Sequence, residues 1–267
     1  MDFNRYRGQR RPRMRALPTS MLALALLVAA APARAENPGF DRPGYGFTPG
    51  VLAAGEAILE QGLPDWSRDR QDGVTVSQYT ADSLLRIGLG GPLEMQWGSD
   101  SWNVLRQASP GGSVHREGRG DSQLGLKLAL PSSHAGFSWG LLGNVTFTDG
   151  EREFRGDHRQ YLLGAQFNLD VSERHSLGLY LENVRRGGAD SPTVALDDSH
   201  ALSSALTLYT ELAWQHLPGE GSGSLAGAGV QWMVTPRVQL DAGFDHRLHG
   251  SANQWQGNLG VSIYFGD

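Results

Sequence analysis

The sequence predicts an all-β fold, in which antiparallel strands close into a transmembrane β-barrel. Three observations lead to this prediction. Apolar and polar residues alternate with a period of two over segments of about ten residues, the connections alternate between short and long, and aromatic residues gather near the segment ends. Strands of soluble sandwiches usually span about 5–6 residues, whereas a strand needs about 9–11 residues to cross the apolar layer of a membrane. The segment length therefore favours the membrane barrel.

The chain begins with the features of an export signal. An apolar run over residues 21–31 follows an arginine-rich stretch and ends in Ala33-Arg34-Ala35, the small-x-small pattern that signal peptidase cleaves. We expect residues 1–35 to be removed, and Met14 would give a more ordinary short basic start than Met1. Pro32 ends the apolar run before it reaches the length of a membrane anchor.

The composition excludes several other classes of protein. Removing residues 1–35 takes away seven arginines and one aspartate, which leaves 16 basic and 27 acidic residues and a net charge of about −11. Such an acidic chain argues against nucleic acid as a partner, because binding it requires a basic face. The absence of cysteine excludes disulfides, thiolate metal sites and thiol catalysis.

Residues 36–53 form a separate Pro/Gly-rich segment, in which the prolines and glycines break both strand and helix periods. The segment could fold into the barrel lumen as a plug or hang into the periplasm as a tail. Its aromatic residues favour packing inside the lumen. The candidate plug residues are Arg42, Tyr45 and Phe47.

The barrel itself is expected over residues 54–267. Runs such as Leu124, Leu126 and Leu128 alternate with small or polar residues, which gives one apolar and one polar face. The third and eighth segments carry the weakest alternation, so ten to twelve strands fit the pattern, and twelve fit it best. The twelve expected strands are roughly 54–63, 75–89, 93–105, 120–130, 137–148, 159–170, 175–185, 193–201, 205–216, 224–234, 237–248 and 254–265.

The connections alternate in length along the chain. Those after the even-numbered segments are short, as at residues 90–92 and 235–236. Those after the odd-numbered segments are mostly longer and more polar, at residues 64–73, 106–119, 149–158 and 186–192. Short turns on one side and longer loops on the other are typical of outer-membrane barrels, with both chain ends in the periplasm.

Aromatic residues of the apolar face lie near the two ends of the expected strands, where the two interfaces of a bilayer favour them. The expected outer ring contains Tyr79, Phe147, Tyr161, Trp214 and Trp255. The expected inner ring contains Trp139, Phe167, Trp232 and Phe265.

The alternation also turns eleven charged residues inward, eight acids and three bases. They are Glu56, Glu60, Asp82, Arg86, Glu94, Lys127, Glu182, Glu211, Asp241, Asp245 and Arg247. Two interpretations stay open. An excess of acids around a hydrated lumen would raise the local concentration of cations, whereas a network of paired charges would brace a filled barrel that conducts nothing.

Catalytic and metal-binding patterns are weak. Ser251 lies near His246 and His249, but a serine near a histidine is common in polar loops. No His-Glu-x-x-His spacing and no phosphate-binding glycine loop occur. We therefore expect no enzyme, no catalytic residue, no metal site and no cofactor.

Four stretches resemble the outer-membrane transporter family named for the meta-cleavage pathway of phenol degradation. They are residues 42–50, 59–65, 119–127 and 234–241, so the resemblance reaches over nearly the whole chain after residue 35. It implies an outer-membrane barrel associated with small-molecule catabolism or transport. The family's motifs are structural, and they carry no catalytic residues over to this chain.

Together these observations predict a protein of the Gram-negative outer membrane. Its expected partners are membrane lipid, the barrel insertion machinery and small solutes. The expected function is passive passage or facilitated uptake of such solutes, with aromatic or hydrophobic ones suggested by the family resemblance. The alternative is a non-conducting barrel with a structural or adhesive role.

Overall fold

A computed structural model describes residue 37 and residues 39–266, and all regular elements in this part of the chain are β-strands. The predicted export signal lies outside the described residues. No helix in the described ranges is long and apolar enough to cross a membrane.

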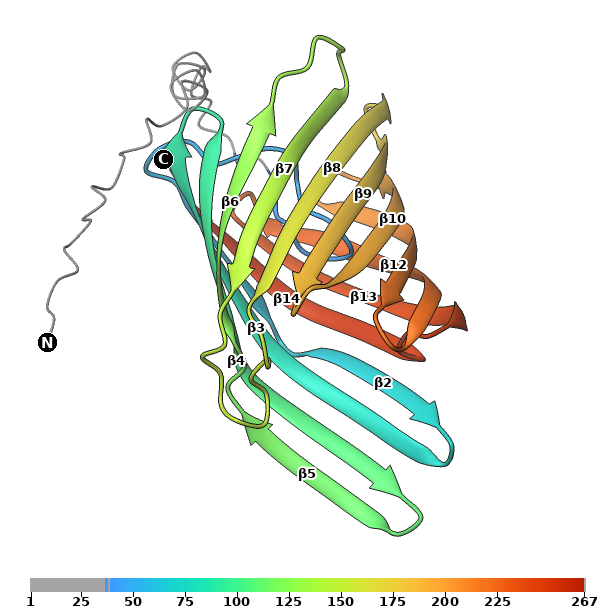
Figure 1. Cartoon of the computed structure of the whole chain (residues 1–267). Helices are drawn as coiled ribbons and strands as arrows, with labels where there is room; N and C mark the ends of the chain where they lie inside the picture. Colours follow the sequence, from blue (N-terminus) through green and yellow to red (C-terminus); the bar gives the residue numbers. More distant parts are fainter. Residues whose placement is uncertain (1–36, 38, 267) are drawn as a thin grey trace, which may run out of the picture.

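Fourteen strand segments follow one another along the chain (Figure 1). They are β1 (Ala57–Gly62), β2 (Asp65–Gln71), β3 (Val74–Gly90), β4 (Leu93–Ser109), β5 (Gly112–Gly118), β6 (Ser122–Leu130), β7 (Phe137–Thr146), β8 (Gln160–Ser172), β9 (His175–Arg186), β10 (Ala189–Ala201), β11 (Leu206–Leu217), β12 (Gly221–Thr235), β13 (Val238–Gly250) and β14 (Trp255–Phe265).

The fourteen segments form twelve barrel strands, because two strands are each interrupted once. β1 and β2 both pair with β3 and with β14, on either side of Leu63 and Pro64. Proline has no N–H to donate to the ladder, which accounts for the break at Pro64. β5 and β6 likewise pair with successive halves of β4, on either side of residues 119–121. The predicted twelve-stranded antiparallel barrel is confirmed.

The barrel closes where the first strand meets the last. Ala57–Gly62 pairs with Gly260–Phe265, residue against residue, and every other strand pairs with its neighbour along the chain. This closed order leaves the membrane-crossing part of the sheet without a free edge, as a strand structure in lipid requires.

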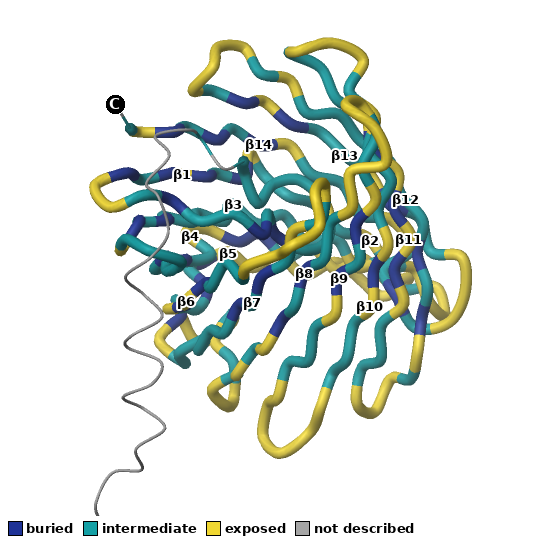
Figure 2. The backbone as a smooth tube through the Cα atoms, turned by 90° about the horizontal axis from the view of Figure 1, so that it is seen from above, coloured by how far each residue is buried: buried dark blue, intermediate teal, exposed yellow. Residues whose placement is uncertain are grey.

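Alternation along the strands separates the two faces of the wall (Figure 2). Leucines of the predicted apolar face are exposed on the outside, among them Leu126, Leu196 and Leu212 at 52–55%. Trp139 and Phe167 stack with ring centroids 5.9 Å apart at the inner end of β7 and β8. Tyr161, Trp214, Trp232 and Phe265 are exposed as well.

Three of the expected long loops are mostly strand. Residues 64–73 contain β2, residues 106–119 contain the end of β4 and all of β5, and residues 186–192 are a two-residue turn with strand on both sides. These segments are polar because they extend beyond the apolar layer, so their composition resembles that of loops. The hairpins β2–β3 and β4–β5 project past the rest of the barrel (Figure 1). The connection over residues 147–159 is irregular, as expected.

A charge on the outer face should reveal the lipid layer. Leu212 lies in the middle of β11 and is 53% exposed. We predict that Leu212→Arg lowers the free energy of unfolding in lipid vesicles by about 2–4 kcal/mol, because arginine is costly at the bilayer midplane. Leu89, 49% exposed near the end of β3, is the control, and Leu89→Arg should cost about 0–1 kcal/mol. Equal, small effects at both positions would contradict a lipid-facing β11.

Candidate functional site

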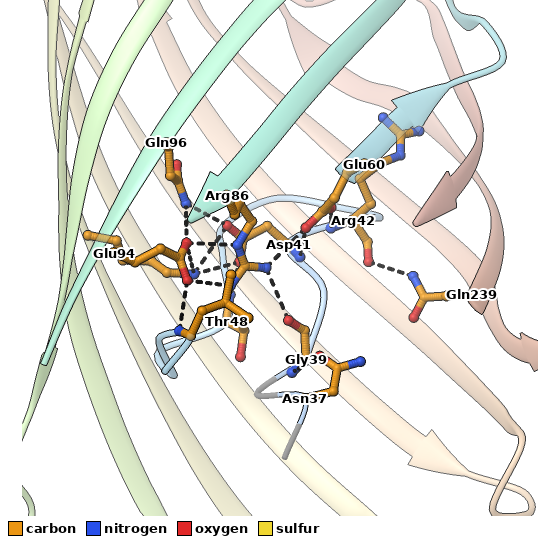
Figure 3. Close-up of polar contacts among 12 residues, drawn as sticks. Asn37, Gly39, Asp41, Arg42, Thr48, Glu60, Arg86, Glu94, Gln96 and Gln239 are labelled. Atoms are coloured by element: carbon orange, nitrogen blue, oxygen red, sulfur yellow. Dashed lines mark hydrogen bonds and ion pairs between the residues drawn. The ribbon is translucent and has the colours of Figure 1, made fainter. Parts of the chain in front are cut away.

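The N-terminal segment, residues 39–53, lies inside the barrel and packs against the inner face of the wall (Figure 3). Phe47 is 6% exposed and meets the ring of Tyr180 edge to face, with centroids 6.0 Å apart. Leu52 is fully buried with Ile58 and Tyr264, close to the seam of the barrel. A segment without regular structure is therefore held in the lumen by apolar contacts at two points.

Five buried charged residues form the centre of this contact, and we call them the Arg86 cluster: Asp41, Glu60, Arg86, Glu94 and Lys127. Arg86 donates from Nε to Glu94 Oε1 (2.7 Å) and from Nη1 to Glu60 Oε1 (3.0 Å). Lys127 Nζ donates to Asp41 Oδ1 (2.9 Å) and lies 3.4 Å from Glu94 Oε1. The side chains of Arg86, Glu94 and Lys127 are completely buried. Buried charges are tolerated when each has such partners, and removing one partner is strongly destabilising.

Asp41 ties the N-terminal segment to this cluster. Its backbone N–H donates to Glu60 Oε1 (2.9 Å), and its carboxylate accepts from Lys127 and from Gln96. Burial acts to raise the pKa of the Asp41 carboxyl, but the positive charges of Arg86 and Lys127 outweigh it and hold the pKa below its ordinary value of 3.8. Because folding lowers this pKa, the ionised carboxylate stabilises the folded state at pH values above 3.8. The contribution is lost as the pH falls through the pKa that Asp41 has in the folded protein. Asp41 therefore stays ionised near neutral pH.

Arg42 bridges wall strands on both sides of the seam. Its guanidinium donates to Asp65 Oδ1 (2.7 Å) and lies 3.2 Å from Asp82 Oδ2, and its Nε lies 3.5 Å from Asp241 Oδ1. The guanidinium passes directly over Gly260, where a Cβ would collide with Nε. Glycine at this position of β14 therefore lets the arginine lie close to the wall.

The opposite side of the lumen is acidic and lacks comparable partners. Glu211 accepts from the backbone N–H of Tyr45 (2.9 Å), and Glu211 and Asp245 are each 5% exposed. Within the described ranges, neither of these two carboxylates forms an ion pair. Burial raises the pKa of the Tyr45 phenol, and the nearby charges of Asp245 and Glu211 raise it further. Gly46 has a φ of 96° and approaches Gln166 so closely that a Cβ would collide with the amide.

The remaining predicted inward residues lie outside the Arg86 cluster, and one of them, Glu56, accepts from the backbone N–H of Ala53 at the end of the segment (2.8 Å). Glu182 accepts from the hydroxyl of Tyr180 (2.5 Å). Glu56 lies just before β1, whereas it was expected inside a strand, and accepts from the hydroxyl of Tyr264 (2.7 Å). Arg247 lies towards the outer rim, where it donates to Asp69 Oδ1 (3.0 Å).

Several partners were not predicted from the sequence. Asp41 is the most important of them, because it contacts both bases of the Arg86 cluster. Its only sequence signal is indirect: an inward-facing Lys127 on a buried strand requires an acid from elsewhere. Alternation places Gln166 and Gln239 on the polar face, but it does not single them out, or Gln96, as buried amides, since uncharged polar residues occur on any inward face.

The serine and histidines considered for catalysis do not form a pair. The hydroxyl of Ser251 donates to the carbonyl oxygen of Glu220 (2.5 Å). His246 packs its ring against Trp255, with centroids 4.2 Å apart. These contacts give Ser251 and His246 structural roles at the outer rim.

Two cavities approach the N-terminal segment from opposite ends of the barrel. The outer cavity has a volume of about 470 Å³ and is lined by Trp66 and Gln78 near the projecting hairpins. The inner cavity has a volume of about 650 Å³ and is lined by residues 172–176 at the opposite end, beside the turn between β8 and β9. Residues 43–47 line both cavities, so the segment separates them.

The fold is that of the outer-membrane β-barrel proteins. No protein-family model and no curated protein matches the chain. Among solved structures it is similar to the COG4313 outer membrane channel from Pseudomonas putida F1, with a TM-score of 0.67 and 15% identity over 84% of this chain and 99% of that one. It is also similar to the KdgM porin in complex with disordered oligogalacturonate, with a TM-score of 0.51 and 8% identity over 79% of this chain and 99% of that one. These two structures are a channel and a porin, and at these identities the likeness concerns the fold. Membership of the phenol-pathway family stays a prediction.

Breaking the Arg86 cluster should destabilise the barrel. In Arg86→Met, Lys127 alone would face Asp41, Glu60 and Glu94. We predict a loss of about 3–5 kcal/mol in the free energy of unfolding, measured by denaturant titration in lipid vesicles. The control is Arg185→Gln, which removes an exposed ion pair with Asp190 and should cost less than about 1 kcal/mol. Equal costs for the two variants would show that the cluster contributes no more than a surface pair.

Proposed function

We propose that the protein is an outer-membrane channel for small solutes, in which residues 39–53 form the constriction. The single observation that carries this proposal is the pair of cavities that end on either face of residues 43–47. A barrel that serves only as a scaffold has no need of two cavities that reach residues 43–47 from opposite sides. The likeness to channels and porins supports the same interpretation at the level of the fold.

We propose further that the channel prefers cations. The outer cavity is lined by Asp41, Asp65, Asp82, Glu60, Glu211 and Asp245, whereas Arg42 is the base that lines it within the described ranges. Carboxylates that line a narrow lumen with low-dielectric walls focus a negative potential and concentrate cations. The resemblance to the phenol-pathway family adds small aromatic compounds to the solutes worth testing.

One observation favours the alternative of a non-conducting barrel. The Arg86 cluster is tightly paired and joins the N-terminal segment to four wall strands, β1, β3, β4 and β6, which is the arrangement expected of a permanent brace. Both functions predict a stable barrel, and conductance separates them.

Removing the constriction should open the lumen. We predict that deletion of residues 36–50 gives a severalfold higher single-channel conductance in planar bilayers, because the two cavities would become continuous. Heat-modifiable gel mobility must first show that the variant is a folded barrel. A folded deletion variant with unchanged conductance would exclude the segment as the constriction, and a full-length protein that conducts nothing in any solute would favour the brace.

Neutralising two inward carboxylates should weaken cation preference. In Asp241→Asn/Asp245→Asn, we predict that the reversal potential in a salt gradient moves towards zero, because two inward carboxylates are lost. The matched control, Asp157→Asn/Asp190→Asn, removes two acids from the exposed outer rim. If the lumen variant keeps the reversal potential of the unaltered protein, these two carboxylates do not select ions.

A further inference from the structure

Two histidines and an aspartate meet at the periplasmic ends of β9 and β10. His175 is the first residue of β9, and it lies directly opposite His200, the second-last residue of β10. Asp198 lies two residues before His200, on the same face of the strand. His175 also lies in the segment 172–176 that borders the inner cavity, whereas Asp198 and His200 line neither cavity.

We propose that His175, Asp198 and His200 form a binding site for a divalent first-row transition-metal ion at the periplasmic rim of the barrel. The Nε2 atoms of His175 and His200 each lie 2.9 Å from the same oxygen, Oδ1 of Asp198. The three potential ligand atoms all lie within 4.8 Å of one another. Metal–ligand bonds of about 2.0–2.2 Å at tetrahedral angles require ligand atoms roughly 3.3 Å apart, so small side-chain rotations would complete the site.

The ring arrangement supports metal binding over a chance encounter of the side chains. The two imidazoles stack with centroids 4.2 Å apart and planes inclined by 13°, and the Nε2 atom of each lies 2.9 Å from one carboxylate oxygen. Oδ1 of Asp198 is hydrogen-bonded to His175 and lies 2.9 Å from Nε2 of His200, so a cation that displaces protons from the rings could sit between these three atoms. Neutral imidazoles and one carboxylate are donors that Zn²⁺, Ni²⁺ and Cu²⁺ favour over Mg²⁺ and Ca²⁺.

The position of the site makes it accessible to an ion and favours the binding of a positive charge. Asp198 and His200 share the outward face with Leu196, and His200 is paired across the sheet with the exposed Leu208. A carboxylate at the edge of an apolar surface is costly without a counter-charge, and a bound dication would supply one. The ligand side chains are between 29% and 54% exposed, so an ion in the periplasm can reach them.

The site offers three protein ligands and an open side. Such an arrangement is typical of sites that keep a water or exchange ligands, whereas purely structural zinc sites have four protein ligands. The site therefore suits reversible binding of a metal ion at the rim, separate from the constriction in the lumen.

The test is a zinc titration of the full mature protein, purified in detergent and treated with a chelator beforehand. Isothermal titration calorimetry should show one saturable Zn²⁺ per chain. His175→Ala, His200→Ala and the isosteric Asp198→Asn should each weaken binding about tenfold or more, since loss of an outer-shell partner alone costs that much in other sites. The control is His216→Ala, at the outer rim beside Ser222, which should bind Zn²⁺ like the unaltered protein.

Cobalt provides a second readout that depends on coordination. Co²⁺ added to the unaltered protein should produce visible absorption bands of a four- or five-coordinate ion, and these bands should be absent in Asp198→Asn. Heat-modifiable mobility confirms that each variant is folded. The proposal is overturned if the unaltered protein shows no saturable binding, or if His175→Ala, His200→Ala and Asp198→Asn all bind Zn²⁺ as His216→Ala does.

Discussion

The closure of the sheet between β1 and β14 is the constraint on which the rest of the structure depends. In the apolar layer, backbone N–H and C=O groups have no water to bond, so a strand with one unpaired side would be prohibitively costly. Both interrupted strands respect this constraint. At Leu63 the backbone N–H still donates to the carbonyl of Leu259 (2.8 Å), and at Gly120 it donates to that of Asp100 (2.8 Å). The chain therefore tolerates Pro64 and the kink at residues 119–121 without opening the wall.

Charges inside the barrel follow from this closed wall. Its inner face cannot be filled by apolar side chains alone, because a lumen reached by water at both ends selects polar residues. Here the polar groups are divided into two regions. Asp41, Arg86 and Lys127 belong to a paired cluster, whereas the acidic residues Glu211 and Asp245 have no ion partners in the described ranges. The first region gives the N-terminal segment its fixed position, and the second lines the lumen with acidic side chains.

The sequence predicts the parts of the fold in which a lipid environment requires an apolar face. It does not predict the parts that lie outside this requirement. Alternation around Leu126 or Leu212 identifies a strand, because one face must be apolar. Asp65–Gln71 lies beyond the expected membrane and needs no apolar face, so the sequence predicts a loop where the structure has a strand. Parity places Arg86 and Glu94 on the inner face, but the path of an aperiodic segment decides that Asp41 meets Arg86. The contact between His175 and His200 likewise depends on the register of two strands at a turn, which the local composition does not indicate.

The bridge made by Arg42 has a consequence for the order of assembly. Arg42 contacts Asp82 on β3, near the start of the barrel, and Asp241 on β13, near its end. The segment that carries it is continuous with β1, one of the two strands that form the seam. Once β1 and β14 have joined, residues 39–53 could enter only by threading through a mouth. The position of residues 39–53 therefore requires either threading through a mouth of the closed barrel or a wall that closes around a segment already inside it.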